Sequence, residues 1–100
     1  MERDLAIVYK SELYKVNKII NRLKGIGLDT TNYERLVSKI DNECSENNKR
    51  DLEKSINTPF MVDYLEANYS KAINELKNIE YELSKYEVYL KVKSFTQIFA

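Results

Sequence analysis

The segment VDYLEANYSKAINELKNIEYELSKYEVYL, residues 62–90, has the strongest periodicity in the chain. Its apolar positions recur at alternating spacings of three and four, which places them on one face of a helix. Over successive heptads this stripe drifts by about 20° each, the drift that a left-handed supercoil removes. The stripe consists of Val62, Leu65, Tyr69, Ala72, Leu76, Ile79, Leu83, Tyr86 and Leu90. Thr58 as a cap, followed by Pro59 at the first helical position, marks the start, and we predict a coiled-coil-like helix over residues 59–93.

The end of this segment has a second interpretation. Residues 86–92, YEVYLKV, also alternate apolar and polar side chains with period two, as a strand does. No other segment offers a convincing partner strand, and a single strand leaves its backbone groups unsatisfied. We therefore predict that these residues are helical.

An amphipathic helix is also expected at the start of the chain, over residues 3–24. Its apolar stripe consists of Leu5, Val8, Tyr9, Leu13, Val16, Ile19, Ile20 and Leu23. Basic side chains, among them Lys15, Lys18 and Arg22, lie on the opposite side. Gly25 follows the last apolar position, and we expect it to take the left-handed conformation that commonly ends a helix.

The second helix is predicted over residues 32–57. Thr31 and Glu34 have the spacing of a capping box, although Asp29 or Thr30 could serve as the cap instead. The apolar positions Tyr33, Leu36, Val37, Ile40 and Cys44 share one face. The pattern then lapses in SENNKRD, residues 45–51, which indicates either a break near Asn47 or one helix with a polar middle. The sequence does not decide between these two.

Three helices joined by short connections predict an all-α fold: an up-down-up antiparallel three-helix bundle that forms one domain over residues 1–100. The third helix is longer than its neighbours by two or three turns. Its excess, from about Tyr86 to Phe99, contains apolar side chains on most sides, which the shorter helices cannot cover.

The composition removes several function classes. The chain has no histidine and a single cysteine, Cys44, so the usual proton shuttle is missing and no thiolate metal site can form. Sixteen acidic residues balance sixteen basic ones, without the excess of positive charge that is typical of nucleic-acid binders. We expect no enzyme activity, no cofactor, no metal, no membrane span and a cytoplasmic location.

The uncovered end of the third helix is the feature that indicates a partner. We expect a protein–protein interaction or self-association module, such as a homodimer, with partner-binding residues Tyr81, Val88, Tyr89, Val92 and Phe95. The alternative is a nucleic-acid-associated accessory protein that contacts phosphate through Lys15, Lys18 and Arg22.

Overall fold

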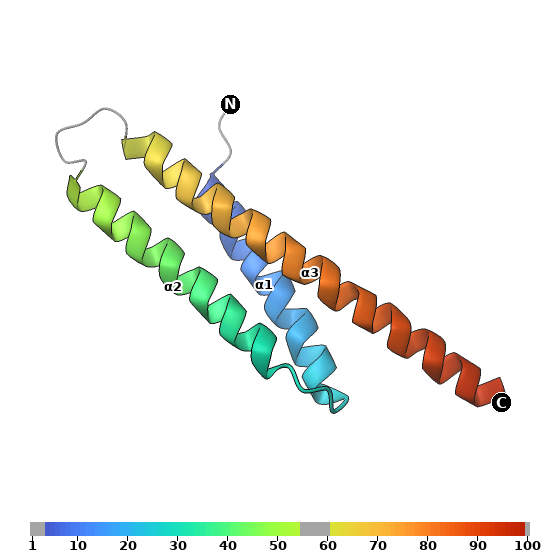
Figure 1. Ribbon diagram of the computed structural model, residues 1–100. Helices are drawn as coiled ribbons and strands as arrows, with labels where there is room; N and C mark the ends of the chain where they lie inside the picture. The colour runs from blue at the N-terminus through green and yellow to red at the C-terminus, as the bar shows by residue number, and fades with distance from the viewer. Residues whose placement is uncertain (1–3, 55–60, 100) are drawn as a thin grey trace.

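The computed structural model describes the backbone of residues 4–54 and 61–99, and the side chains of residues 4–53 and 65–91. Within these ranges the chain forms three α-helices and no strand. They are α1 (Leu5–Gly25), α2 (Thr31–Lys54) and α3 (Met61–Phe99). Figure 1 shows the three helices running in alternating directions, each antiparallel to the one before it. The predicted all-α three-helix antiparallel bundle is confirmed.

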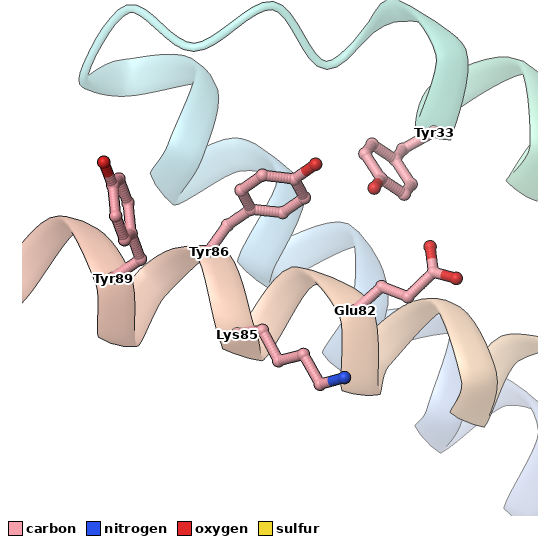
Figure 2. A pocket seen from close by; sticks show the side chains of 5 residues that line it. All are labelled: Tyr33, Glu82, Lys85, Tyr86 and Tyr89. Atoms are coloured by element: carbon pink, nitrogen blue, oxygen red, sulfur yellow. The ribbon is translucent and has the colours of Figure 1, made fainter.

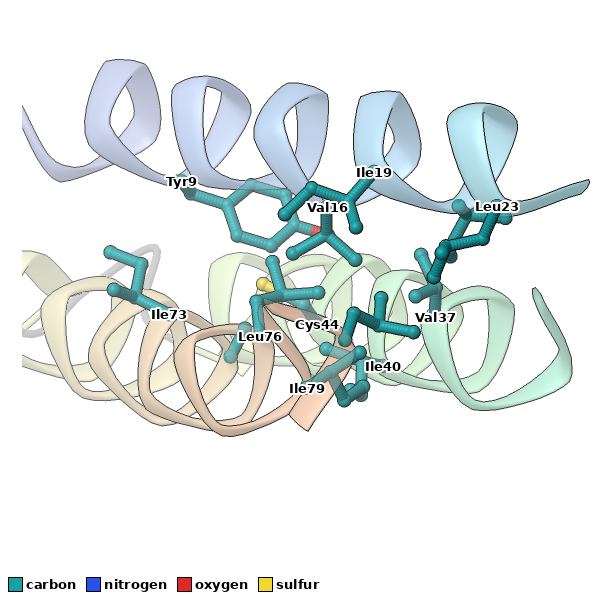
Figure 3. Packing of buried hydrophobic residues seen from close by; sticks show 13 residues of the cluster. Tyr9, Val16, Ile19, Leu23, Val37, Ile40, Cys44, Ile73, Leu76 and Ile79 are labelled. Carbon is teal, nitrogen blue, oxygen red and sulfur yellow. The ribbon is translucent and has the colours of Figure 1, made fainter. Parts of the chain in front are cut away.

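The helix α3 is the element against which the other two pack. It lies along both α1 and α2, whereas α1 and α2 contact each other much less. The predicted stripe is buried in its central part, and Leu76 and Leu83 have no exposed surface at all. Figure 3 shows apolar side chains of α1 pointing toward those of α2 and α3. The core consists of Tyr9, Val16, Ile19, Ile20, Leu23, Val37, Ile40, Cys44, Ala72, Ile73, Leu76, Ile79 and Leu83.

The end of α1 differs from the prediction. Gly25 is the last helical residue, and the left-handed conformation lies at Gly27, with φ of 92°. The N–H of Gly27 donates to the C=O of Lys24, and the N–H of Leu28 donates to the C=O of Leu23, both at 3.1 Å. These two bonds form a Schellman motif, which satisfies carbonyl groups at the helix end.

The apolar contact that accompanies this motif explains the two-residue shift. With Gly27 in the left-handed position, Leu28 returns to the core that contains the fully buried Leu23. With Gly25 there instead, the corresponding residues would be Ile26 and the exposed, polar Asn21. The helix therefore ends where the chain can bury a leucine.

The start of α2 is capped by Asp29, one of the three candidates. Its carboxylate accepts hydrogen bonds from the backbone N–H of Thr31 at 3.1 Å and from the Thr31 hydroxyl at 2.7 Å. These bonds hold the pKa of Asp29 below its ordinary value. Thr31 and Glu34 do not form the capping box, because Thr31 is already the first helical residue and the Glu34 carboxylate binds Lys24 at 3.3 Å.

The helix α2 continues without a break to Lys54, so the polar stretch is the middle of one helix. Its polar side chains contact α3: the amide of Asn68 donates to Asn48 at 3.0 Å and to Asp51 at 2.8 Å. The lapse in the apolar pattern is therefore a polar contact between two helices. Residues 55–57 of the predicted helix lie outside the described residues.

Residues 86–92 are helical, as predicted, and α3 continues to Phe99, six residues beyond the predicted end. The predicted start at Thr58 and Pro59 lies outside the described residues.

The two glycines of the first loop give a matched test of this helix end. No neighbouring atom lies within 4 Å of a Cβ built at either position, so only the backbone conformation distinguishes them. We expect Gly25→Ala to raise the free energy of unfolding by about 0.5 kcal/mol, since alanine favours a helix. Gly27→Ala should lower it by about 1 kcal/mol, because alanine resists a positive φ. Urea denaturation of both variants measures these changes, and the opposite order would contradict the helix end described here.

Candidate partner-binding face

Three of the five predicted partner-binding residues have described side chains, and all three are exposed. The exposed fractions are 65% for Tyr81, 62% for Val88 and 61% for Tyr89. Tyr81 and Val88 are one heptad apart, so they lie on one line along the solvent side of α3. Tyr89 lies about 100° further around the helix, on the side of α2. We call these three residues the α3 face.

The side chains of Val92 and Phe95, the other two predicted residues, lie outside the described residues. Their backbone belongs to α3, and Figure 1 shows this end of the helix projecting beyond the loop between α1 and α2.

The uncovered part of α3 is shorter than predicted, because the other two helices contact α3 beyond Tyr86. The Arg22 guanidinium at the end of α1 donates two hydrogen bonds to the Glu87 carboxylate, at 2.9 and 3.0 Å. Leu90 packs against the core, and the ring of Tyr86 meets that of Tyr33 edge to face at 6.3 Å between centroids. The projecting end therefore begins after Lys91 and not at Tyr86.

A lysine of α3 already occupies one ring of the α3 face. The ammonium of Lys85 lies 4.3 Å from the centroid of the Tyr81 ring, within the range of a cation–π interaction. Lys18 lies over Tyr14 on α1 in a similar arrangement, at 5.9 Å. Lysine ammonium groups therefore lie over tyrosine rings on two separate helices.

A concave site of about 420 Å³ lies next to the α3 face, between α3 and the first turn of α2. It is lined by Tyr33, Glu82, Lys85, Tyr86 and Tyr89, and we call it the tyrosine notch. Figure 2 shows the hydroxyl groups of Tyr33 and Tyr86 directed toward each other, with Glu82 on the side of Tyr33.

The chemistry of the tyrosine notch follows from this grouping of oxygens. Burial, hydrogen bonding with Tyr86 and the negative charge of Glu82 raise the pKa of Tyr33 to about 12. The Tyr33 hydroxyl therefore stays protonated at neutral pH, and it lies beside the carboxylate of Glu82.

Sequence reasoning selected Tyr89 but not the rest of this site. Tyr33 and Tyr86 were assigned to apolar stripes, and the site exists only because the antiparallel arrangement places the start of α2 beside Tyr86. No signal within either helix places Tyr33 beside Tyr86, because their contact depends on the register of α2 against α3.

The basic residues of the alternative function are already in contact with other side chains. Arg22 binds Glu87, Lys15 lies 3.8 Å from the carboxylate of Glu12, and Lys18 lies over Tyr14. The sequence pattern predicts that Arg22 points away from the bundle, whereas its guanidinium binds Glu87 of α3. All three residues are nevertheless exposed on the surface of α1.

A buried glutamate in α1 was not anticipated. Glu12 occupies the core side of the helix and is only 4% exposed, and its Oε1 has no hydrogen-bond partner among the described residues. Burial, and next the neighbouring carboxyl of Glu80, raise the pKa of Glu12, while Lys15 and Lys77 oppose this effect. A charged Glu12 therefore costs stability.

Other chemistry finds little support among the described side chains. Burial and the charge of Asp41 raise the pKa of the Cys44 thiol, which keeps it protonated. Across residues 4–53 and 65–91, no three acidic or cysteine side chains lie close enough to share a metal ion. Within the parts of the chain covered by the structure, no helix has the length and apolar character that crossing a lipid bilayer demands.

Searches of protein-family models, curated proteins and solved structures found no match to this chain. The geometry of the α3 face and the tyrosine notch is therefore the basis of the functional proposal.

The buried glutamate gives a prediction about pH. Because the pKa of Glu12 is raised in the folded state, the folded protein binds this proton more tightly than the unfolded chain does. The contribution of Glu12 to the free energy of unfolding therefore becomes less unfavourable as the pH falls toward the pKa that Glu12 has in the unfolded chain. We expect Glu12→Gln to raise the free energy of unfolding at pH 7 by about 1 kcal/mol, and by progressively less at acidic pH.

Urea denaturation at several pH values, compared between variant and wild type, measures this difference. The comparison is needed because Glu87, whose pKa Arg22 lowers, changes stability in the opposite direction. Glu46→Gln, on the exposed surface of α2, is the control and should show no such trend. A destabilised Glu12→Gln variant at pH 7 would refute the assignment.

Proposed function

We propose that the protein is a non-catalytic helical interaction module that self-associates through the α3 face. The observation that carries this proposal is the exposure of Tyr81, Val88 and Tyr89, each above 60%, on a helix whose opposite side forms the core. Tyrosine is enriched in protein interfaces because its ring offers a large apolar area and its hydroxyl a hydrogen bond.

A second copy of the chain suits this face for two reasons. The formal net charge is zero, so two copies do not repel each other at long range. Two α3 helices that pair antiparallel about a twofold axis near Ser84 would place Tyr81 of each copy beside Val88 of the other. The pairing is therefore self-complementary and of coiled-coil type, and the long α3 provides the backbone for it.

The proposal includes a cytoplasmic setting, in which the buried thiol of Cys44 stays reduced. It contains no catalytic step and no cofactor. The nucleic-acid alternative gains no support from the contacts of Lys15, Lys18 and Arg22.

Sedimentation velocity over a concentration series tests the proposal. We expect the wild-type protein to associate at high micromolar concentration, and Tyr81→Ser combined with Val88→Ser to weaken this association at least about tenfold. Circular dichroism should show that the double variant keeps its fold, because both residues lie on the surface.

The chain offers a closely matched control. Ile7 and Tyr14 of α1 are also one heptad apart, with exposed fractions of 65% and 67%. The double variant Ile7→Ser and Tyr14→Ser should associate like the wild type. A wild-type protein that remains monomeric at high micromolar concentration would remove the self-association proposal, and a loss of association confined to the α1 variant would move it to another face.

A further inference from the structure

We propose that the tyrosine notch binds the charged end of a lysine or arginine side chain that the partner presents when it docks on the α3 face. This inference rests on the proposed function, because it names a chemical feature of the partner. It is carried by the grouping of three tyrosine rings, one carboxylate and a volume of about 420 Å³ beside an exposed helix face.

Three tyrosine rings line the notch and provide surfaces that attract a cation. Tyr33 and Tyr86 meet edge to face, and Tyr89 stands on the next turn of α3 (Figure 2). The faces of tyrosine rings attract cations, and aromatic walls also accept the apolar stem of a long basic side chain. Lys85 on Tyr81 and Lys18 on Tyr14 show that such contacts occur in this protein.

The oxygen atoms of Glu82, Tyr33 and Tyr86 favour a cation over a neutral apolar group. Glu82 is exposed on the notch and provides a negative charge. The hydroxyl of Tyr33 lies near that of Tyr86, so both phenol oxygens are placed where they can accept hydrogen bonds from an ammonium or guanidinium group. Charge-assisted hydrogen bonds of this kind are stronger than those between neutral groups.

The lysine in the lining does not fill the notch with its own charge. The ammonium of Lys85 lies over the Tyr81 ring, at 4.3 Å, which belongs to the outer line of α3. Figure 2 shows the Lys85 side chain directed away from the hydroxyl groups of Tyr33 and Tyr86. Its stem lines the site, while Glu82 remains to attract a second cation.

The position of the notch supports a side chain from the partner as its occupant. Tyr89 belongs both to the notch and to the α3 face, so the two surfaces are continuous. A helix that docks on Tyr81 and Val88 therefore lies beside the opening, within reach of a long side chain.

A titration of the 100-residue chain by NMR tests the inference separately from self-association. The probes are the Nα-acetyl N-methylamides of lysine and arginine, and the norleucine compound serves as the neutral control of similar shape. At low salt, at least one cationic probe should give saturable shifts at Tyr33, Glu82, Tyr86 and Tyr89, and the norleucine compound should bind at least about fivefold more weakly. Equal binding of the norleucine compound, or no saturable shift from either cation, would overturn the inference.

Two exposed residues allow variants that keep the fold. Glu82→Gln should weaken the cationic probe about tenfold, because the carboxylate is lost, and Tyr89→Leu about threefold, because a ring is lost. Glu66→Gln, an exposed glutamate elsewhere on α3, should bind the probe like the wild type. Unchanged binding by Glu82→Gln would refute the role of the charge.

The result of the probe titration can be distinguished from the result of the self-association test. The Tyr81→Ser and Val88→Ser double variant lacks the centre of the α3 face but retains the notch, so it should bind the probe with wild-type affinity. Association without probe binding would reject the notch alone, and probe binding without association would reject self-association alone.

Discussion

The whole structure depends on the burial of one ridge of α3, from Ala72 to Leu83, against two helices that contact each other only slightly. Both α1 and α2 bury their apolar sides on this ridge. The inner side of α3 is therefore fully used, and the outer side carries Tyr81 and Val88 into solvent. The candidate binding surface is a direct result of this arrangement, because the helix with two partners on one side has none, within the described residues, on the other.

Polar contacts fix how the three helices are aligned. The Tyr9 hydroxyl of α1 donates to Asp41 of α2, Asn68 of α3 donates to Asp51 of α2, and Arg22 of α1 binds Glu87 of α3. Apolar stripes tolerate sliding by a turn, whereas paired polar groups lose their hydrogen bonds when the register changes. These contacts join every pair of helices, including α1 and α2, whose apolar contact is slight.

The periodicity of the sequence was sufficient to predict the three helices and the buried stripe, because burial on one side imposes a spacing of three and four. It placed the left-handed end of α1 at Gly25 rather than Gly27, since only the folded core shows where Leu28 is buried, and it left Asp29 as one of three candidate caps of α2. The burial of Glu12 and the grouping of Tyr33 with Tyr86 depend on which turn of one helix lies beside which turn of another. That information is absent from any single helix.

The slight contact between α1 and α2 also determines when the chain can acquire its core. Arg22 and Glu87 are 65 positions apart, and the ridge on which the first two helices pack belongs to the last third of the sequence. A nascent chain that has emerged from the ribosome as far as Lys54 contains the two amphipathic helices α1 and α2. It still lacks the ridge of α3 on which both of them pack. We therefore expect the core to form only after α3 has been synthesised, with contacts between distant segments slowing the process.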